Sequence, residues 1–244
     1  MRIATWNLES YRNITPEREE LFKTEMKKVD ADIWVLTETW RGFSPGDDYG
    51  LLAESSEATD LVKWPKRCWV SIWVKSQVGN LTQEVCNEPD RMIRGRIEIS
   101  AKDTIVVVGT VLPWGSDSLF PGAKGFCDAV RKQEIDWTIR AGDSSDCTYF
   151  VAGDFNHAIT YQRWYGSKDG ADILNEVLQK HDLECLTQTG KELQDVSPAI
   201  DHICVRRSRN AALTVPVVGS WKIPSLEEKP ITDHRGVFVD FEVD

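Results

Sequence analysis

The fold of this chain is decided by one stretch, Phe150-Val151-Ala152-Gly153-Asp154-Phe155-Asn156. An apolar run ends there abruptly in Gly-Asp-Phe-Asn, which is typical of a buried strand that stops at the rim of a sheet. Side chains at i and i+2 of an extended chain point the same way, so Asp154 and Asn156 share one side. Together they can bind or orient a water molecule, a metal ion or a phosphate oxygen.

Length and composition indicate an ordinary globular protein. The 244 residues are 41% hydrophobic and 28% charged, and we expect one domain over residues 1–244. The net charge of −10 argues against tight nonspecific binding to bulk nucleic acid, which usually needs a basic face. It does not exclude a metal-dependent enzyme acting on phosphates, because a carboxylate cluster counts as negative charge until the metal arrives.

Cysteine spacing and the N-terminus bear on the cellular compartment. The six cysteines are scattered without a C-x-x-C pair, so a zinc site is not expected. The chain begins directly with a predicted strand, and it contains neither a signal peptide nor an apolar run that could span a bilayer. We therefore expect reduced, mostly buried thiols in a cytoplasmic protein without a membrane span.

Hydrophobic periodicity predicts an alternation of strands and helices. A helix begins at the N-cap Thr15 and Pro16 and buries Phe22, Met26 and Val29. Two further helices are predicted over residues 124–140 and 171–181, and residues 41–66 are predicted to be irregular. The predicted strands cover 2–8, 33–36, 69–75, 95–101, 104–111, 149–152, 200–205, 212–218 and 237–243, with 104–111 in a central position.

Five segments share one form, a strand edge that carries Asn, Glu, Asp or His. In chain order they are Asn7/Glu9, Glu38, Asp154/Asn156, Asp201/His202 and Asp233/His234. A hard cation bound by carboxylate oxygens neutralises a phosphate and its leaving oxyanion, and a His–Asp pair moves a proton. The set is therefore typical of metal-assisted attack of water on a phosphate ester, and each such effect contributes roughly a hundredfold or more in rate.

This set and its order resemble the endonuclease/exonuclease/phosphatase superfamily, from Trp6 to His234. That superfamily includes DNase I-like nucleases, apurinic endonucleases, sphingomyelinases and inositol-polyphosphate 5-phosphatases. The resemblance implies a four-layered α/β sandwich, with two mostly antiparallel sheets packed face to face and helices outside. It also implies a phosphate-ester substrate, with DNA or RNA ranked slightly ahead of small molecules and lipid head groups.

The resemblance further implies roles for individual residues. Glu38 would be the principal Mg²⁺ (or Mn²⁺) ligand, with Glu9 near the metal and Asp233 beside it. Asn7 would support the metal site.

Four more residues would carry out the chemistry itself. Asp154 would orient or deprotonate the attacking water, and Asn156 would hold that water or a phosphate oxygen. His234 would hydrogen-bond the scissile phosphate, while Asp201 would hold His234 in the useful tautomer.

The sequence departs from the superfamily at Val111-Leu112-Pro113-Trp114-Gly115. Many of its nucleases carry Tyr or His at the end of this central strand, and Trp114 stands where a phosphate-contacting Asn would be. We expect Trp114 to stack on a base, sugar or lipid group. Arg131 could reach a phosphate or form a plain surface salt bridge, and Trp164 is a candidate substrate wall or a packing residue.

Other polar residues favour structural interpretations. His202 is expected to be structural, as is His181 at a helix end, and His157 should face away from Asn156. The basic groups around Lys63/Lys66/Arg67, Arg91/Arg94/Arg96 and Arg206/Arg207/Arg209 are expected to be solvated faces, although one of them could follow a nucleic-acid backbone.

Two other functions stay open from the sequence alone. The chain could be a non-catalytic module that retains the binding site, as the Val111–Trp114 run suggests. It could also act beside a protein partner whose basic surface supplies nucleic-acid affinity.

Overall fold

The computed structural model describes residues 1–10, 14–56, 66–138, 147–159, 165–188, 199–206, 213–221 and 223–243. Its helices are α1 (Pro16–Val29), α2 (Gly122–Glu134) and α3 (Lys168–Lys180). The strands are β1 (Arg2–Asn7), β2 (Ile33–Trp40), β3 (Tyr49–Glu54), β4 (Arg67–Lys75), β5 (Asn80–Glu84), β6 (Met92–Glu98), β7 (Thr104–Val111), β8 (Thr148–Asp154), β9 (Glu184–Cys185), β10 (Asp201–Arg206), β11 (Leu213–Ser220), β12 (Ser225–Leu226), β13 (Lys229–Pro230) and β14 (Val237–Val243).

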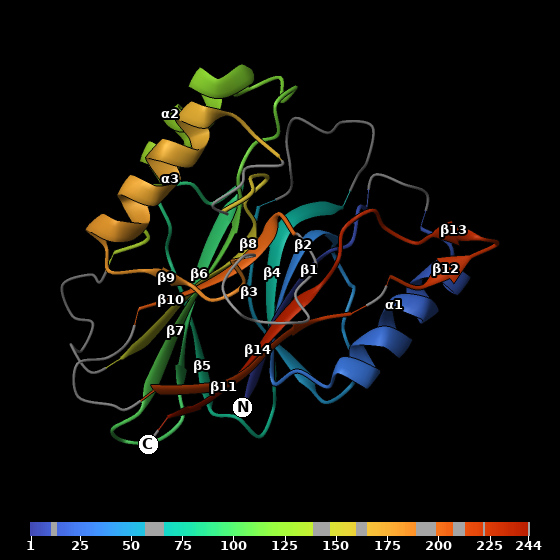
Figure 1. Ribbon diagram of the computed structural model, residues 1–244. Coiled ribbons are helices and arrows are strands. Elements are labelled where there is room, and N and C mark those ends of the chain that lie inside the picture. Colours follow the sequence, from blue (N-terminus) through green and yellow to red (C-terminus); the bar gives the residue numbers. More distant parts are fainter. Residues whose placement is uncertain are drawn as a thin grey trace.

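Two six-stranded sheets form the centre of the molecule (Figure 1). The first has the order β11-β14-β1-β2-β4-β3, and the second has the order β5-β6-β7-β8-β10-β9. Within these sheets β1 pairs with β2 and β7 pairs with β8 in parallel, and the other neighbours are antiparallel. The predicted central position of residues 104–111 is confirmed, because β7 lies inside the second sheet.

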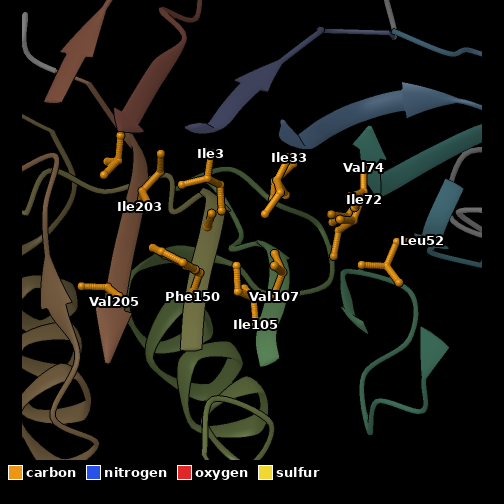
Figure 2. Packing of buried hydrophobic residues seen from close by; sticks show 14 of the residues in the cluster. Ile3, Ile33, Leu52, Ile72, Val74, Ile105, Val107, Phe150, Ile203 and Val205 are labelled. Atoms are coloured by element: carbon orange, nitrogen blue, oxygen red, sulfur yellow. The ribbon is translucent and has the colours of Figure 1, made fainter. Parts of the chain in front are cut away.

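Alternation along the strands divides the apolar residues between an inner and two outer layers. Ile3 and Ile33 from the first sheet meet Val107, Phe150 and Ile203 from the second, and all of them are buried (Figure 2). Burying a side chain of this size stabilises the fold by about 1.5–3 kcal/mol. This inner cluster therefore holds the two sheets face to face.

The helices cover the outer faces of both sheets. Phe22 and Met26 of α1 pack with Trp6 and Trp34 on the outer side of the first sheet. Residues of α2 and α3 form a separate cluster with Val151 and other outward-facing residues of the second sheet. The result is the expected four-layered α/β sandwich, with α1 on one side and α2 and α3 on the other (Figure 1).

Several predicted element boundaries were wrong. The stretch 41–66 is not irregular throughout, because β3 occupies residues 49–54, and β5 was not expected at all. Both are edge strands, half-exposed and without a regular apolar alternation, so they gave no periodic signal. The strand predicted over 95–101 is β6, which begins at Met92.

The second and third helices also differ from their predicted bounds. The helix expected over 124–140 ends at Glu134, and the next residue, Ile135, is 60% exposed and does not continue the buried stripe. Helix α3 begins at Lys168, three residues before the expected start. Ser167 caps it by accepting a hydrogen bond from the Gly170 backbone N–H, a cap that apolar periodicity does not reveal.

Candidate active site

The candidate site lies where the ends of four strands from the two sheets meet. Parallel pairing brings the carboxyl ends of β1 and β2 to one edge, and β7 and β8 end together in the other sheet. The amide of Asn7 at the end of β1 donates to Asp154 Oδ2 at the end of β8, over 2.9 Å. This hydrogen bond joins the two sheets at the point where the sequence predicted the chemistry.

A second hydrogen-bonded pair, Asp201 and His234, joins the two sheets next to the Asn7–Asp154 pair. Antiparallel pairing of β10 with β8 sets Asp201 directly opposite Asp154. His234, in the loop before β14, has its Nδ1 2.7 Å from Asp201 Oδ2. Because a carboxylate only accepts, this Nδ1 carries a hydrogen and the other ring nitrogen, Nε2, faces away from Asp201. The Trp6 indole donates to the His234 carbonyl over 3.0 Å and fixes the loop.

Asp154 is held by three hydrogen bonds and is buried. The Asn156 backbone N–H donates to Oδ1 over 2.8 Å, and the Asn156 side-chain amide donates to Oδ2 over 3.0 Å. That amide also donates to the Leu112 carbonyl over 2.9 Å. The side-chain nitrogen of Asn156 therefore donates to two protein acceptors, and one of these hydrogen bonds fixes the orientation of the Asp154 carboxylate.

The site binds protons more strongly than isolated side chains would. Burial raises the pKa of Asp154 to about 7; the positive charge of His234 lowers it, while the charges of Asp201 and Glu38 raise it. Burial lowers the pKa of His234, but the charges of Asp201 and Asp154 outweigh burial and raise it well above the usual value. Both pKa shifts result from burial together with the negative charges of several carboxylates close to one another. A bound cation would neutralise part of that negative charge.

Glu38, near the end of β2, forms a buried ion pair with Arg67 of β4. Arg67 Nη2 lies 2.6 Å from Glu38 Oε2, and the guanidinium also lies 4.3 Å from the centre of the Trp69 ring. The expectation that Arg67 belongs to a solvated face was wrong. Its side chain is only 5% exposed, because the carboxylate at the end of the neighbouring strand supplies a partner.

The expectation was also wrong for Arg91 and Arg94, whereas Lys66 is exposed as expected and Arg96 and Arg206 are partly exposed. Arg91 is buried and donates to Asp117 over 2.6 Å, and Arg94 is fully buried with Glu84 as an ion-pair partner. Lys63, Arg207 and Arg209 lie outside the described residues.

Three site residues have left-handed backbone conformations. The φ angles are 50° at Glu9 and 46° at both Glu38 and Asn156. Such angles are uncommon for residues other than glycine and cost about 1–3 kcal/mol each. At Glu9, one local and one tertiary hydrogen bond hold the chain in this form. The Glu9 backbone N–H donates to Asn7 Oδ1, and Glu9 Oε2 accepts from the Asp233 backbone N–H.

Asp233 itself is the most exposed residue of the set. Its side chain is 63% exposed, and its Oδ1 lies 3.5 Å from Nε2 of His234. The carboxylate therefore stands at the mouth of the site, next to the ring nitrogen that Asp201 leaves free.

Two structural residues were missed by the sequence reasoning. Arg18 of α1 is buried and donates to the carbonyls of Leu8 and Ile231, which tie together the two loops that carry Glu9 and Asp233. It lies four residues before Phe22 on the same helical stripe, a position that would have indicated burial. Thr232 donates to the Asn7 carbonyl over 2.9 Å and has no comparable sequence signal.

The three candidate substrate contacts, Trp114, Arg131 and Trp164, have different outcomes. Trp114 is half-buried and packs against Trp69, with ring centres 6.0 Å apart. Arg131 forms ion pairs with Glu134 and Glu176 of the outer helices. Of the two alternatives for Arg131, a phosphate contact or a surface salt bridge, these contacts match the salt bridge. Trp164 lies outside the described residues.

The remaining histidines are engaged with the protein. His202 is buried, and its Nε2 lies 3.0 Å from the His157 carbonyl. The His157 ring bonds the Ser167 carbonyl, and His181 bonds Glu134. The structural interpretation of His202 and His181 therefore agrees with their contacts.

Residue types and distances make the site able to hold a cation. Asp154, Asp201 and His234 offer ligand atoms that all lie within 4.8 Å of one another. Glu38 and Glu9 are also buried and add hard oxygen donors. Oxygen-rich sites of this kind suit Mg²⁺ or Mn²⁺ better than a softer metal.

Two face-to-face mixed sheets, with acidic and imidazole groups at their common edge, define the DNase I-like class of α/β sandwiches. The chain belongs to the Endonuclease/Exonuclease/phosphatase family, whose model matches residues 4–234. The family indicates a phosphoesterase of the nuclease or phosphatase type. No curated protein sequence matches the chain.

Solved structures support the fold over the whole chain. Humanized D. rerio TDP2 is 13% identical with a TM-score of 0.69, covering 99% of this chain and 98% of that one. The human Nocturnin catalytic domain is 15% identical with a TM-score of 0.69, covering 100% and 93%. A mannosyl-6-phosphatase from Bacteroides thetaiotaomicron is 14% identical with a TM-score of 0.65, covering 99% of each chain. None of the helices described here has the length and apolar content that a bilayer crossing requires.

Proposed function

We propose that the chain is a Mg²⁺- or Mn²⁺-dependent hydrolase that cleaves a phosphodiester by direct attack of water, with nucleic acid as the substrate class. The observation that carries this proposal is the pair of hydrogen bonds across the sheets, Asn7 to Asp154 and His234 to Asp201. They hold a carboxylate and an imidazole, which can take and give protons, in one buried place.

Asp154 is the base in this proposal. Its carboxylate is fixed by Asn7 and Asn156, and the raised pKa of about 7 lies near the value at which a general base works best in neutral solution. Asn156 acts by orienting Asp154. The water that attacks the phosphorus would lose its proton to Asp154.

His234 binds the phosphate in this proposal. Its pKa is raised because the charges of Asp201 and Asp154 outweigh burial, which favours the protonated ring as a donor to a phosphate oxygen through Nε2. Asp201 fixes its orientation from the other ring nitrogen, and Asp233 lies beside the donating one.

Glu38 and Glu9 are the residues that would hold the metal, with Asp233 at the mouth of the site. When bound, the cation would neutralise the phosphate and the leaving oxygen. Arg67 engages Oε2 of Glu38, which fixes that carboxylate in one orientation before any metal binds.

The proposal is tested with a panel of single- and double-stranded DNA, RNA, cyclic nucleotides, phosphomonoesters and lipid head-group esters. Product release in Mg²⁺ or Mn²⁺, its loss in EDTA, and its loss in His234→Ala are expected. His181→Ala is the matched control, because His181 contacts Glu134 on the helix layer away from the site. Absence of turnover on every substrate under both metals would overturn the proposal.

A phosphatase or phosphodiesterase acting on a small molecule or a lipid head group is the second candidate. The observation in its favour is the end of β7, where Val111 provides neither phenol nor imidazole and Trp114 packs on Trp69. Turnover of phosphomonoesters or head-group esters without cleavage of DNA or RNA would select it. Metal binding by calorimetry without any turnover would instead select a non-catalytic binding module.

A partner that supplies nucleic-acid affinity is tested separately. Gel shifts of His234→Ala with DNA and RNA at several salt concentrations measure whether this acidic chain binds a nucleic acid alone. Binding that appears only after a basic protein is added would support the partner.

A further inference from the structure

Two cysteines face each other across the edge of the second sheet. Cys185 of β9 and Cys204 of β10 are direct partners in the antiparallel pairing. The Leu186 N–H donates to the Ile203 carbonyl over 2.9 Å, so the next pair along the ladder is the hydrogen-bonded one. Cys185 and Cys204 therefore form a non-hydrogen-bonded pair, in which Cα atoms are about 4.5 Å apart and side chains are closest.

This separation is compatible with a disulfide bond. Disulfides join Cα atoms that are about 4.4–6.8 Å apart. Both side chains belong to the apolar cluster under the outer helices, so both point to the same side of the sheet. Neither backbone has to move far for the two sulfurs to bond.

A histidine and a threonine surround the first of these sulfurs. His202 Nδ1 lies 3.7 Å and Thr187 Oγ1 lies 3.9 Å from Cys185 Sγ. The other ring nitrogen of His202 lies 3.0 Å from the His157 carbonyl. A carbonyl only accepts, so Nε2 carries the hydrogen. Nδ1 faces the sulfur, where it accepts from the thiol when the ring is neutral and donates to the thiolate when the ring is charged.

The two thiols are unequal. Burial raises the pKa of Cys185, but its hydrogen bond with Cys204 and the charge of His202 outweigh burial and lower it well below the usual value. Burial and the neighbouring Cys185 raise the pKa of Cys204 well above its usual value. One sulfur is thus suited to attack an electrophile, and the other to follow as a thiol.

We propose that Cys185 and Cys204 are a redox modification site at which a hydroperoxide converts the two thiols into a reversible disulfide. Nothing in this proposal depends on the phosphoesterase site, because none of the residues proposed to act on phosphate takes part.

The chemistry balances in two steps. With hydrogen peroxide as the hydroperoxide, Cys185 sulfur attacks one peroxide oxygen, the O–O bond breaks, and the Cys185 proton leaves with the other oxygen as water, which gives a sulfenic acid. Cys204 sulfur then attacks Cys185 sulfur, the S–O bond breaks, and the hydroxide leaves with the Cys204 proton as a second water. Two thiols are oxidised by two electrons and one peroxide is reduced.

The position of β9 provides access for the oxidant. Cys185 is 4% exposed and Cys204 is fully buried, so the native surface does not present either thiol widely. However, β9 has only two residues, it is an edge strand of the second sheet, and its Glu184 is exposed. Local opening of so short an edge strand costs little free energy compared with global unfolding, and a hydroperoxide is small.

The test is performed on the full chain with hydrogen peroxide. After oxidation, free thiols are blocked in denaturant and the peptides are mapped without reduction. We expect a peptide that links Cys185 to Cys204, reversed by dithiothreitol, and a rise in the melting temperature of roughly 5–10 °C from closing this loop. Recovery of both cysteines in blocked, reduced form while Cys127, which is half-buried, is oxidised would overturn the proposal.

Two variants separate the roles of the sulfurs. In Cys204→Ala, the sulfenic acid on Cys185 should persist and be trapped by dimedone, and in Cys185→Ala no adduct should form on Cys204. Cys127→Ala is the matched control and should give the same crosslink as wild type. A dimedone adduct on Cys204 in Cys185→Ala would contradict the assigned order. The peptide mapping is performed on wild type, so it tests the proposal even if a variant fails to fold.

Discussion

Arg67 Nη2 and Glu38 Oε2 lie 2.6 Å apart, and both side chains are buried. Arg67 begins β4 and Glu38 lies near the end of β2, the neighbouring antiparallel strand, so the pair is built into the first sheet. Removing one partner of such a pair leaves a buried charge without compensation, at a cost of about 3–5 kcal/mol. Arg67→Met should lower the free energy of unfolding in urea by about this amount.

Arg131→Met is the matched control for Arg67→Met. The Arg131 ion pairs lie on the surface, and its side chain is 42% exposed. Its loss should cost much less than the loss of Arg67, because solvent screens exposed ion pairs. Equal costs for the two variants would contradict the structural importance of the buried pair.

Removing the imidazole or its orienting carboxylate should reduce the rate of phosphate-ester hydrolysis. His234→Ala should lower kcat by about 10²–10⁴-fold, the range for loss of a proton-transferring or phosphate-binding group. Asp201→Asn keeps the shape but loses the charge that holds Nδ1–H, so it should also lower kcat, and the pH profile should shift. A steady-state rate of Asp201→Asn equal to wild type at all pH values would remove Asp201 from the mechanism.

The stability of the metal-free protein should depend on the ionisation of Asp154. Its folded-state pKa of about 7 lies above the ordinary value of 3.8, so the folded state retains a proton that the unfolded state releases. Stability contributed by the protonated form is therefore lost as the pH rises from about 4 to about 7, and it changes little above that. We expect wild type to lose stability relative to Asp154→Asn across this interval.

Urea denaturation in EDTA at pH 4, 5, 6, 7 and 8 measures this difference. Asp172→Asn is the control, because Asp172 is an exposed acid on α3. A difference between wild type and Asp154→Asn that stays constant over the whole interval would be inconsistent with the raised pKa.

Gly153 should not tolerate a side chain. Its φ is +141°, and a Cβ there would lie 2.0 Å from the Thr110 carbonyl oxygen of β7. Strain and displacement of β8 should together cost roughly 2–5 kcal/mol in Gly153→Ala. Gly115→Ala has no atom within 4 Å of the added carbon and should stay within about 0.5 kcal/mol of wild type by urea denaturation. If Gly153→Ala leaves the free energy of unfolding unchanged, β8 can shift without cost, which would contradict this prediction.

Metal should stabilise the protein through Glu38. A cation that binds only the folded state at 100 times its Kd contributes about 2.7 kcal/mol, which calorimetric melting can measure. Mg²⁺ and Mn²⁺ should raise the Tm of wild type, and Glu38→Gln should lose most of that rise. Glu176→Gln, an exposed acid on α3, should retain it. If Mg²⁺ or Mn²⁺ raises the Tm of Glu38→Gln as much as that of wild type, Glu38 is not a metal ligand.

The sequence predicted the long elements better than the short ones. Residues 104–111 and 237–243 have strongly apolar or alternating patterns and were predicted at their observed bounds. The edge strands β3 and β5 are half-exposed and carry polar residues, so nothing in their pattern distinguishes them from loops. Burial of Arg67 and Arg94 was equally invisible, because it depends on acids that other strands bring to them.

The sequence by itself determined the family and the set of strand-end residues, because a strand that ends in Gly-Asp-Phe-Asn keeps its side chains on known sides of the sheet. Only the tertiary structure decided which of these residues touch. Asn7 bonds Asp154 from 147 positions away, and His234 bonds Asp201 from 33 positions away. The reason is physical: each contact joins one sheet to the other, and the inner core of the two sheets fixes their relative position.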